Sequence, residues 1–214
     1  MNNKSRTIRQ VCRVCSLGVG IFALAGCNPS VSDSSSYDDL RTCTPESGSL
    51  QQDELSTFDG CERLDGHVTL RNGFPDRRNL RSIVVITGNL GGGGYVGESL
   101  SLEGFDSLEV VEGNLSFLED NLVDYSGVPN LRRVGGFNAM AVPELEDFRG
   151  LENLREVLGP FRVTYNPKLR SLAGLEGLER VHGDLSIGEN PELPAAEVEA
   201  LLEHVTVDGE ITVQ

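Results

Sequence analysis

The sequence predicts a mainly β protein: a solenoid of about seven stacked coils of parallel strands, closed by a short C-terminal helix. Three observations predict it. An apolar phrase recurs along most of the 214-residue chain, its apolar positions alternate with the period of a strand, and one segment near the C-terminus has helical spacing instead. Because one unit of about 23 residues cannot bury its apolar side alone, neighbouring units must stack to form a core.

The first 26 residues have the composition of an export signal. A basic leader without acids precedes an apolar stretch, residues 17–25, that is too short to span a bilayer as a stable helix. The stretch ends in Leu-Ala-Gly-Cys, which resembles the lipobox of bacterial lipoproteins. The resemblance implies that residues 1–26 are a lipoprotein signal peptide and that Cys27 carries a diacylglyceryl thioether. An ordinary signal peptide cut after Gly26, which leaves a free thiol, and an uncleaved anchor remain alternatives.

The net charge limits the partners of the protein. It is −15 for the whole chain and −19 without the four basic residues of the leader. This balance argues against nucleic acid and against an electrostatic grip on anionic lipid. We therefore expect membrane attachment through the lipid anchor. Asn28 resembles the outer-membrane address of Gram-negative lipoproteins, which implies a lipid-anchored protein of the bacterial outer membrane.

Two segments lie between the signal and the repeats. Residues 27–42 are rich in Ser and Asp and are expected to form a flexible tether, while residues 43–60 are expected to form an N-terminal cap. Of the five cysteines, Cys12 and Cys15 lie in the leader and Cys27 is the lipidation site. Cys43 and Cys61 are then the two cysteines left in an exported protein, so we expect a disulfide between them. It would close a loop of about 18 residues, worth about 3 kcal/mol in the chain-entropy model.

The repeats, residues 61–214, align on one glycine each. Residues two before, two after and four after this glycine share one face of a strand and are mostly aliphatic. We expect this face to point inward, with the glycine allowing a bend or a close backbone approach. The aligned glycines are Gly66, Gly88, Gly113, Gly136, Gly159, Gly183 and Gly209.

Further elements complete each unit. An upstream phrase such as Leu172-x-Gly174-x-x-x-Leu178 predicts a turn at the glycine and a second inward-facing side. Asn166-Pro167 and Asn190-Pro191 predict corners, with Asp120-Asn121 as a third candidate, where the asparagines would bond to the backbone of the next coil.

The last elements close the predicted column of coils. Residues 194–204 combine a Pro at the first turn with strong helix formers, and their apolar side chains share one helical face. A final strand is expected over residues 207–213. With no Trp and few aromatic residues, the core is expected to be aliphatic.

The phrase Leu-x-x-Leu-x-x-Val-x-Gly-x-Leu-x-Ile-x-x-Asn-Pro-x-Leu at residues 175–193 resembles the receptor L-domain family. This family has leucine-rich, right-handed β-helical lobes and occurs in receptor ectodomains and bacterial lipoproteins. The resemblance covers about residues 61–193 and implies a right-handed parallel β-helix that acts as a binding or scaffolding module without catalysis. The plain leucine-rich horseshoe is the alternative fold.

Two units depart from the pattern. Gly91, Gly92, Gly93 and Gly94 are expected to interrupt the strand of the second unit as a bulge, and with Tyr95 they are the candidate binding loop. In the fourth unit, Asn138 takes a position where an inward aliphatic residue is expected.

Residues for catalysis, metal binding or cofactor binding do not form a recognisable motif, so we expect none of these sites. His67, His182 and His204 occupy different repeat positions. The outward strand columns offer one base, Arg162, and two acids near the C-terminal end, Asp184 and Glu210, for polysaccharide chemistry. We expect a recognition module for an unknown protein or glycan. A structural or adhesive envelope protein and a β-helical glycan-active enzyme are the alternatives.

Overall fold

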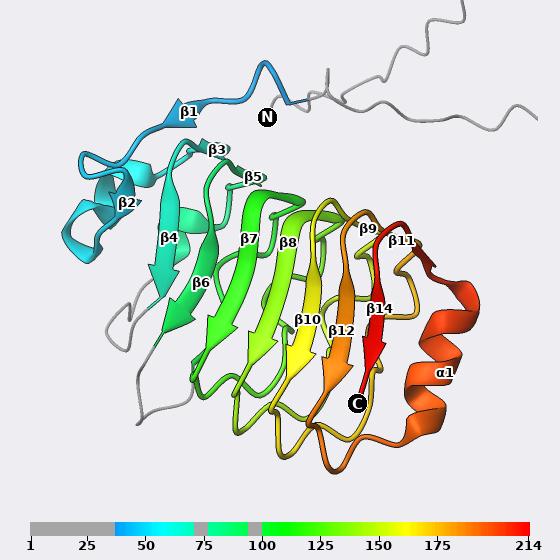
Figure 1. Cartoon of the computed structure of the whole chain (residues 1–214). Coiled ribbons are helices and arrows are strands. Elements are labelled where there is room, and N and C mark those ends of the chain that lie inside the picture. Colours follow the sequence, from blue (N-terminus) through cyan, green and yellow to red (C-terminus); the bar gives the residue numbers. More distant parts are fainter. Residues whose placement is uncertain (1–36, 71–76, 94–99) are drawn as a thin grey trace, which may run out of the picture. The chain divides into compact units, whose positions relative to one another are not determined.

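The computed structural model describes residues 37–70, 77–93 and 100–214. The signal segment, Cys27, most of the tether, Gly94 and Tyr95 lie outside these residues. In the described part the protein is mainly β, with one α-helix and parallel strands in a sheet that is not closed into a barrel (Figure 1). The expectation of a mainly β protein with parallel strands and a C-terminal helix is confirmed.

The sheet of the described residues has 14 strands. They are β1 (Thr42–Cys43), β2 (Ser49–Leu50), β3 (Arg63–Leu64), β4 (His67–Leu70), β5 (Val85–Ile86), β6 (Leu90–Gly93), β7 (Val110–Leu118), β8 (Arg133–Met140), β9 (Glu156–Val157), β10 (Phe161–Thr164), β11 (Arg180–Val181), β12 (Leu185–Gly188), β13 (Thr206–Val207) and β14 (Ile211–Val213). The helical segments are the 3₁₀ helices η1 (Gln52–Phe58) and η2 (Arg78–Leu80) and the α-helix α1 (Ala195–His204).

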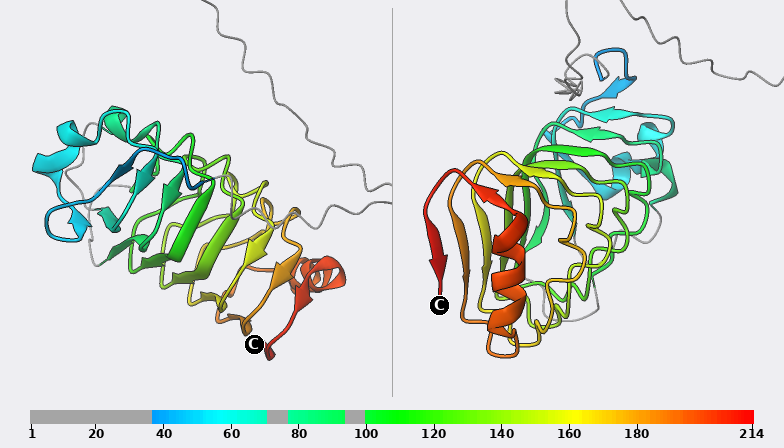
Figure 2. Two further views of the ribbon diagram at one scale, coloured as in Figure 1. Left: turned by 90° about the horizontal axis from the view of Figure 1, so that it is seen from above. Right: turned by 90° about the vertical axis from the view of Figure 1, so that its right-hand side faces the viewer.

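The strands form two parallel runs that merge in the middle of the sheet. One run follows the order β1-β3-β5-β7-β8-β9-β11-β13, and the other follows β2-β4-β6-β7-β8-β10-β12-β14. The two long strands β7 and β8 belong to both runs, because there the chain continues through the glycine without a break in the strand. Figure 2 shows the same strands side by side from two further directions.

The register agrees with the alignment of the repeats. The residues two before the glycine pair in sequence, from Leu64 with Ile86 to Val181 with Val207. The residues two after the glycine also pair with one another, beginning with Val68 and Leu90. Apart from Asn138, all of these residues before β13 are buried. The predicted inward face is therefore confirmed, with one exception in the fourth unit.

The prediction for the fourth unit is wrong by one residue. Phe137, not Asn138, pairs with Leu115 on one side and with Phe161 on the other. Phe137 is 1% exposed, whereas Met140, which the alignment placed inside, is 39% exposed. This unit has one residue fewer between its two inward positions, so every later side chain in the strand changes face.

The aligned glycines stack on one another, except that in the fourth unit Gly135 takes the place of Gly136. The N–H of Gly88 donates to the carbonyl of Gly66 at 2.9 Å, and the N–H of Gly209 donates to that of Gly183 at 3.2 Å. A Cβ on Gly209 would lie 2.6 Å from the backbone of Gly183, which is closer than real contacts allow. The close backbone approach is confirmed as the reason for glycine here.

The corner asparagines bond to the backbone of a neighbouring coil as expected, but it is the preceding coil and not the next one. The Asn190 side chain accepts the N–H of Asn166 at 2.9 Å and donates to the carbonyl of Val163 at 2.9 Å. Asn166 repeats this pattern with the N–H of Val142 and the carbonyl of Ala139. Because both amides are buried, these bonds satisfy backbone groups that water cannot reach.

The segment expected as an N-terminal cap contributes two strands to the sheet. Cys43 pairs with Leu64, and Leu50 pairs with Val68, so both continue the inward positions of the repeats. The Cys43 and Cys61 sulfurs are bonded, with Cα atoms 5.9 Å apart. The disulfide therefore ties this additional unit to the first aligned one.

The core is mainly aliphatic but has an aromatic centre that the composition did not predict. The rings of Phe137 and Phe161 stack with their centroids 4.8 Å apart. The centroid of the Tyr125 ring lies 5.6 Å from that of Phe137 and 5.8 Å from that of Phe148. A small number of aromatic residues can form this cluster because they lie in consecutive units, which stack directly on one another. Such contacts add to the stabilisation from apolar burial.

The helix α1 lies next to β14 at the C-terminal end of the sheet (Figures 1 and 2). Val198 and Leu201 on one face of the helix are buried, as their spacing predicts. The expected final strand is divided into β13 and β14 by the bend at Gly209. Ile211 and Val213 remain 49% and 50% exposed, because no further strand covers this edge in the described residues.

Candidate binding surface

The predicted site residues lie in different environments. Gly91, Gly92 and Gly93 belong to β6 and pair with β7, so the expectation that they interrupt the strand is wrong. A glycine is needed because a Cβ on Gly91 would overlap the carbonyl of Ser116, and one on Gly92 would lie 2.7 Å from the Asp120 carboxylate. The structure thus gives Gly91 and Gly92 a packing role, and a binding role of the loop that includes Gly94 and Tyr95 stays a prediction.

Asp120, whose carboxylate lies close to Gly92, and Tyr125 are two buried polar residues of the core region. Asp120 is 3% exposed, and its carboxylate accepts the N–H of Leu118 at 3.3 Å. Burial raises the pKa of Asp120 to about 6, an effect that this hydrogen bond opposes. The buried Tyr125 hydroxyl has no hydrogen-bond partner in the described structure. Burial and, to a smaller degree, the charge of Asp120 raise the pKa of Tyr125 above its ordinary value.

The three histidines are each engaged in local contacts. His67 accepts the N–H of Asn89 on Nδ1 at 2.9 Å, so the neutral ring carries its proton on Nε2. His182 lies between the carboxylates of Glu156 and Asp208, at 2.7 and 3.1 Å. The ring of His204 contacts the carbonyl of Ala200 at 2.9 Å within α1. The structure does not bring the three together.

Other charged groups are paired between consecutive units. Lys168 contacts Glu144 at 2.7 Å, and Arg180 donates two hydrogen bonds to Asp208 at 2.8 and 3.1 Å. These bonds are the largest cause of the lowered pKa of Asp208. Such exposed pairs contribute little stability each, and they occupy groups that would otherwise be candidates for chemistry.

Arg162 and Asp184, two of the residues considered for polysaccharide chemistry, do not share a strand position. Arg162 pairs in register with Asn138 and Ser186, whereas the Asp184 carboxylate accepts the N–H of Glu210 at 3.0 Å. Asp184 thus holds the backbone of the next unit.

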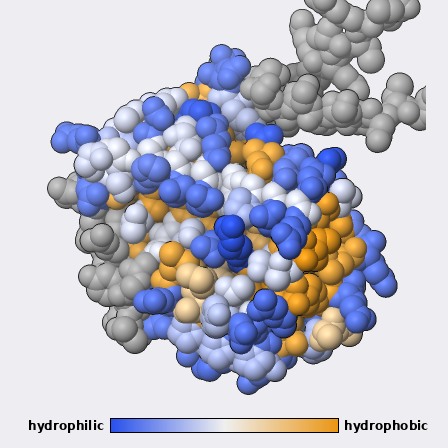
Figure 3. Space-filling model, viewed as in Figure 1, coloured by the Kyte–Doolittle hydropathy of each residue, from blue (hydrophilic) through white to orange (hydrophobic). Residues whose placement is uncertain are grey.

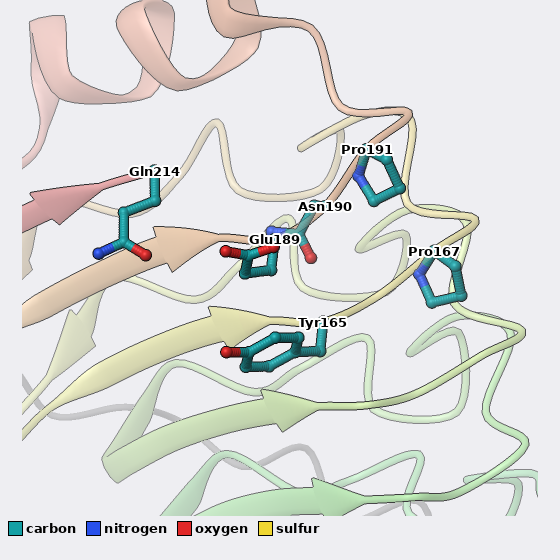
Figure 4. A pocket seen from close by; sticks show the side chains of 6 residues that line it. All are labelled: Tyr165, Pro167, Glu189, Asn190, Pro191 and Gln214. Atoms are coloured by element: carbon teal, nitrogen blue, oxygen red, sulfur yellow. The ribbon is translucent and has the colours of Figure 1, made fainter.

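A hollow of about 500 Å³ lies where β10, β12 and β14 end (Figure 4). Tyr165, Glu189 and Gln214 follow these strands one after another. Tyr165 and Glu189 have left-handed backbones, with φ of 60° and 54°, which point the chain into the corner. Tyr165 is 57% exposed. The residues that line the hollow are Tyr165, Pro167, Glu189, Asn190, Pro191 and Gln214.

The hollow adjoins the open edge of the sheet at β14. The space-filling view shows hydrophobic residues gathered on the side of the molecule where β14 and α1 lie (Figure 3). The half-exposed Ile211 and Val213 lie on this strand, and Gln214 joins it to the hollow. An aromatic ring, two prolines, the Glu189 carboxylate and the Gln214 amide at the ends of neighbouring strands can bind a ligand with both apolar and polar parts, whereas the Asn190 amide is already bonded to the backbone.

The sequence identified neither Tyr165 nor the open edge. Tyr165 and Glu189 each precede an Asn-Pro corner, which is the signal that could have placed them side by side. Ile211 and Val213 were assigned to the inward face, and their exposure follows only from the end of the sheet.

Within residues 37–70, 77–93 and 100–214, no His, Cys, Asp or Glu side chains converge in a set of three or more that could bind a metal ion. The helices of these segments are too short or too polar to cross a bilayer. No model of a known protein family matches the chain, and no curated protein matches it.

Proposed function

We propose that this protein is a lipid-anchored recognition module of the bacterial cell envelope, built on a right-handed parallel β-helix of the receptor L-domain type. In this proposal Cys27 carries the lipid, residues 27–42 connect it to the domain, and the domain binds a protein or glycan without catalysis. The anchor rests on the lipobox-like tetrapeptide and the basic leader, and the fold type rests on the repeat phrase.

The β-helical fold is supported by the two parallel runs of strands in one continuous register. Each strand pairs with its counterpart in the next unit, and the glycines and asparagines repeat their contacts from unit to unit. In a solenoid each unit contacts only its neighbours. Removal of residues 159–182, one whole unit, should therefore leave a cooperatively folded domain by circular dichroism and thermal melting. An unfolded product would contradict the proposed architecture.

The recognition function is carried by one observation, the hollow at the strand ends, which extends from the exposed Tyr165 after β10 to Gln214 at the apolar edge. Exposed aromatic side chains next to apolar surface and a few polar groups are typical of binding sites. Many charged side chains of the described repeats instead bond between units, as Asp184 and Asp208 do. This use of the charges favours a binding module over the glycan-active alternative.

Crosslinking on intact cells tests the function directly. The tagged full chain, expressed in a Gram-negative host of known envelope composition, should be recovered in the outer-membrane fraction and should crosslink to a defined envelope component. Cys27→Ser should release the domain from that fraction. If the wild-type protein is not membrane-associated, or if it crosslinks only to itself, the recognition proposal is wrong and the structural or adhesive alternative is favoured.

A further inference from the structure

We infer that the open edge at β14 binds an extended, basic peptide segment of a partner protein as an added strand. This inference rests on the proposed function as a recognition module and names the partner by its chemistry. The segment would have apolar side chains at alternate positions and Lys or Arg at its ends. β14 is the last strand of its run, with a partner strand, β12, on one side within the described residues.

The backbone of β14 provides hydrogen-bonding groups for such a strand. The pairing with β12 uses the carbonyl of Glu210, which accepts the N–H of Leu185 at 2.9 Å, and the N–H of Gln214, which donates to Ile187 at 3.1 Å. In a parallel ladder, alternate residues direct both of their backbone groups to the same side. The N–H and carbonyl groups of Ile211 and Val213 therefore point away from β12 to the open edge.

The side chains of this edge fit an alternating apolar segment. Ile211 and Val213 continue the two inward columns and pair in register with Leu185 and Ile187, which are 0% and 2% exposed. They are themselves half exposed because their outer sides lack the cover that each earlier strand receives from the next. Two apolar side chains at positions i and i+2 of an added strand would supply this cover.

Charge decides which strand the edge accepts. Glu210 precedes β14, Glu189 follows the neighbouring strand β12 and lines the hollow near the other end of β14, and both side chains are exposed. A cationic residue at either end of the added strand thus meets a carboxylate. Antiparallel pairing of two copies would instead bring the acids at the two ends of β14 against one another, between chains that each carry a net charge of −15. A basic peptide is therefore favoured over a second copy.

The hollow can bind residues of the peptide that lie just outside the added strand. Gln214 leads from β14 into it, and Tyr165 and Glu189 lie on its wall (Figure 4). Because β12 and β14 lie between Tyr165 and the added strand, only a long side chain such as Arg would reach across Gln214 toward the Glu189 carboxylate and the Tyr165 ring. Main-chain bonds would then supply affinity, and the hollow would supply selectivity.

The test measures binding of a fluorescein-labelled synthetic peptide in which Ile and Val alternate with Thr and an Arg pair stands at each end. Fluorescence anisotropy with the full chain should show saturable binding. The same peptide with alternate backbone nitrogens methylated, or with Glu in place of Arg, should bind at least about tenfold more weakly.

Two variants of the protein locate the site. Ile211→Lys should weaken peptide binding at least about tenfold, because it adds positive charge and removes the apolar cover. Leu158→Lys is the matched control, since Leu158 is a similarly exposed apolar residue, at 47%, away from the β14 edge; it should leave binding unchanged. Val213→Pro keeps an apolar residue and the pairing with β12 but removes an outward N–H, so it should also weaken binding. Thermal melting of each variant verifies that it is folded.

The results separate this inference from the proposed function. Failure of the wild type to bind the peptide, or equal binding by folded Val213→Pro, overturns the edge inference. If envelope crosslinking persists in that case, the recognition function stands at another surface. A wild-type dimer in sedimentation that Val213→Pro dissociates would show that a second copy occupies the edge, and it would overturn the peptide inference.

Discussion

Replacing Asp120 by Asn should make the protein more stable at neutral pH. Asp120 occupies the repeat position of Asn166 and Asn190, whose side-chain amides each donate to a buried carbonyl of the preceding unit. A carboxylate cannot donate, and the Asp120 carboxylate lies against the backbone of Gly92. An asparagine has the same shape and supplies the missing N–H, and a protonated Asp120 would supply an O–H.

The size of the effect follows from the pKa of Asp120. A rise from 3.8 to about 6 corresponds to at most about 3 kcal/mol. Water near the sheet surface screens part of this, so we expect Asp120→Asn to add about 1–2 kcal/mol to the free energy of unfolding above pH 6. The folded protein holds the proton more tightly than the unfolded chain. The stability that the proton supplies is therefore full below about pH 3.8 and is lost as the pH rises through about 6.

Urea unfolding of both proteins at several pH values between about 4 and 8 measures this difference. The stability advantage of the variant should be smallest near pH 4 and grow through pH 6. Asn166→Asp is the reverse control: it should lose stability at neutral pH and recover part of it on acidification. If the difference between wild type and Asp120→Asn is the same at every pH, ionisation of Asp120 does not limit stability and the reasoning is refuted.

Three further predictions concern the packing. Phe137→Ala should lower the free energy of unfolding, measured in urea, by about 3–5 kcal/mol, whereas Asn138→Ala should lower it by less than about 1 kcal/mol. A larger loss for Asn138→Ala would mean that Asn138 points inward, as the repeat alignment predicted. Gly91→Ala should lower the melting temperature, because its Cβ would overlap the backbone of β7, and an unchanged melting temperature would mean that β6 can move away. Reduction of Cys43–Cys61 should cost about 2–4 kcal/mol; an unaltered urea midpoint under reducing conditions would contradict this contribution.

The regular part of the fold could be predicted because period-two apolar positions determine which face of a strand is buried. Val181 and Leu185 were placed correctly, since their unit has the common spacing. The fourth unit failed because Gly135 and Gly136 are adjacent, and either could be aligned with the other glycines. Only the pairing of Phe137 with its neighbours on both sides distinguishes them.

The candidate site could be predicted less well than the fold. An exposed edge depends on what does not stack beyond β14, and a repeat pattern contains no information about that. Tyr165 lies at a corner where the backbone is left-handed. The same repeat position has a left-handed backbone in three other units, at Glu119, Ala141 and Glu189. The variety of these four side chains hid the common backbone conformation.

The stacking of glycines and asparagines from one unit to the next has a consequence for the order in which the chain can fold. Every strand pairs with a segment about one unit away, as Ser49 does with His67 and Leu185 with Ile211. The loop that closes with each added unit is thus short and nearly constant in length, so its entropy cost hardly changes along the chain. Folding can start where β7 and β8 span both runs and can proceed outward in both directions. The two ends, one closed by a covalent bridge and the other by a helix, would then be the last to form and the first to open.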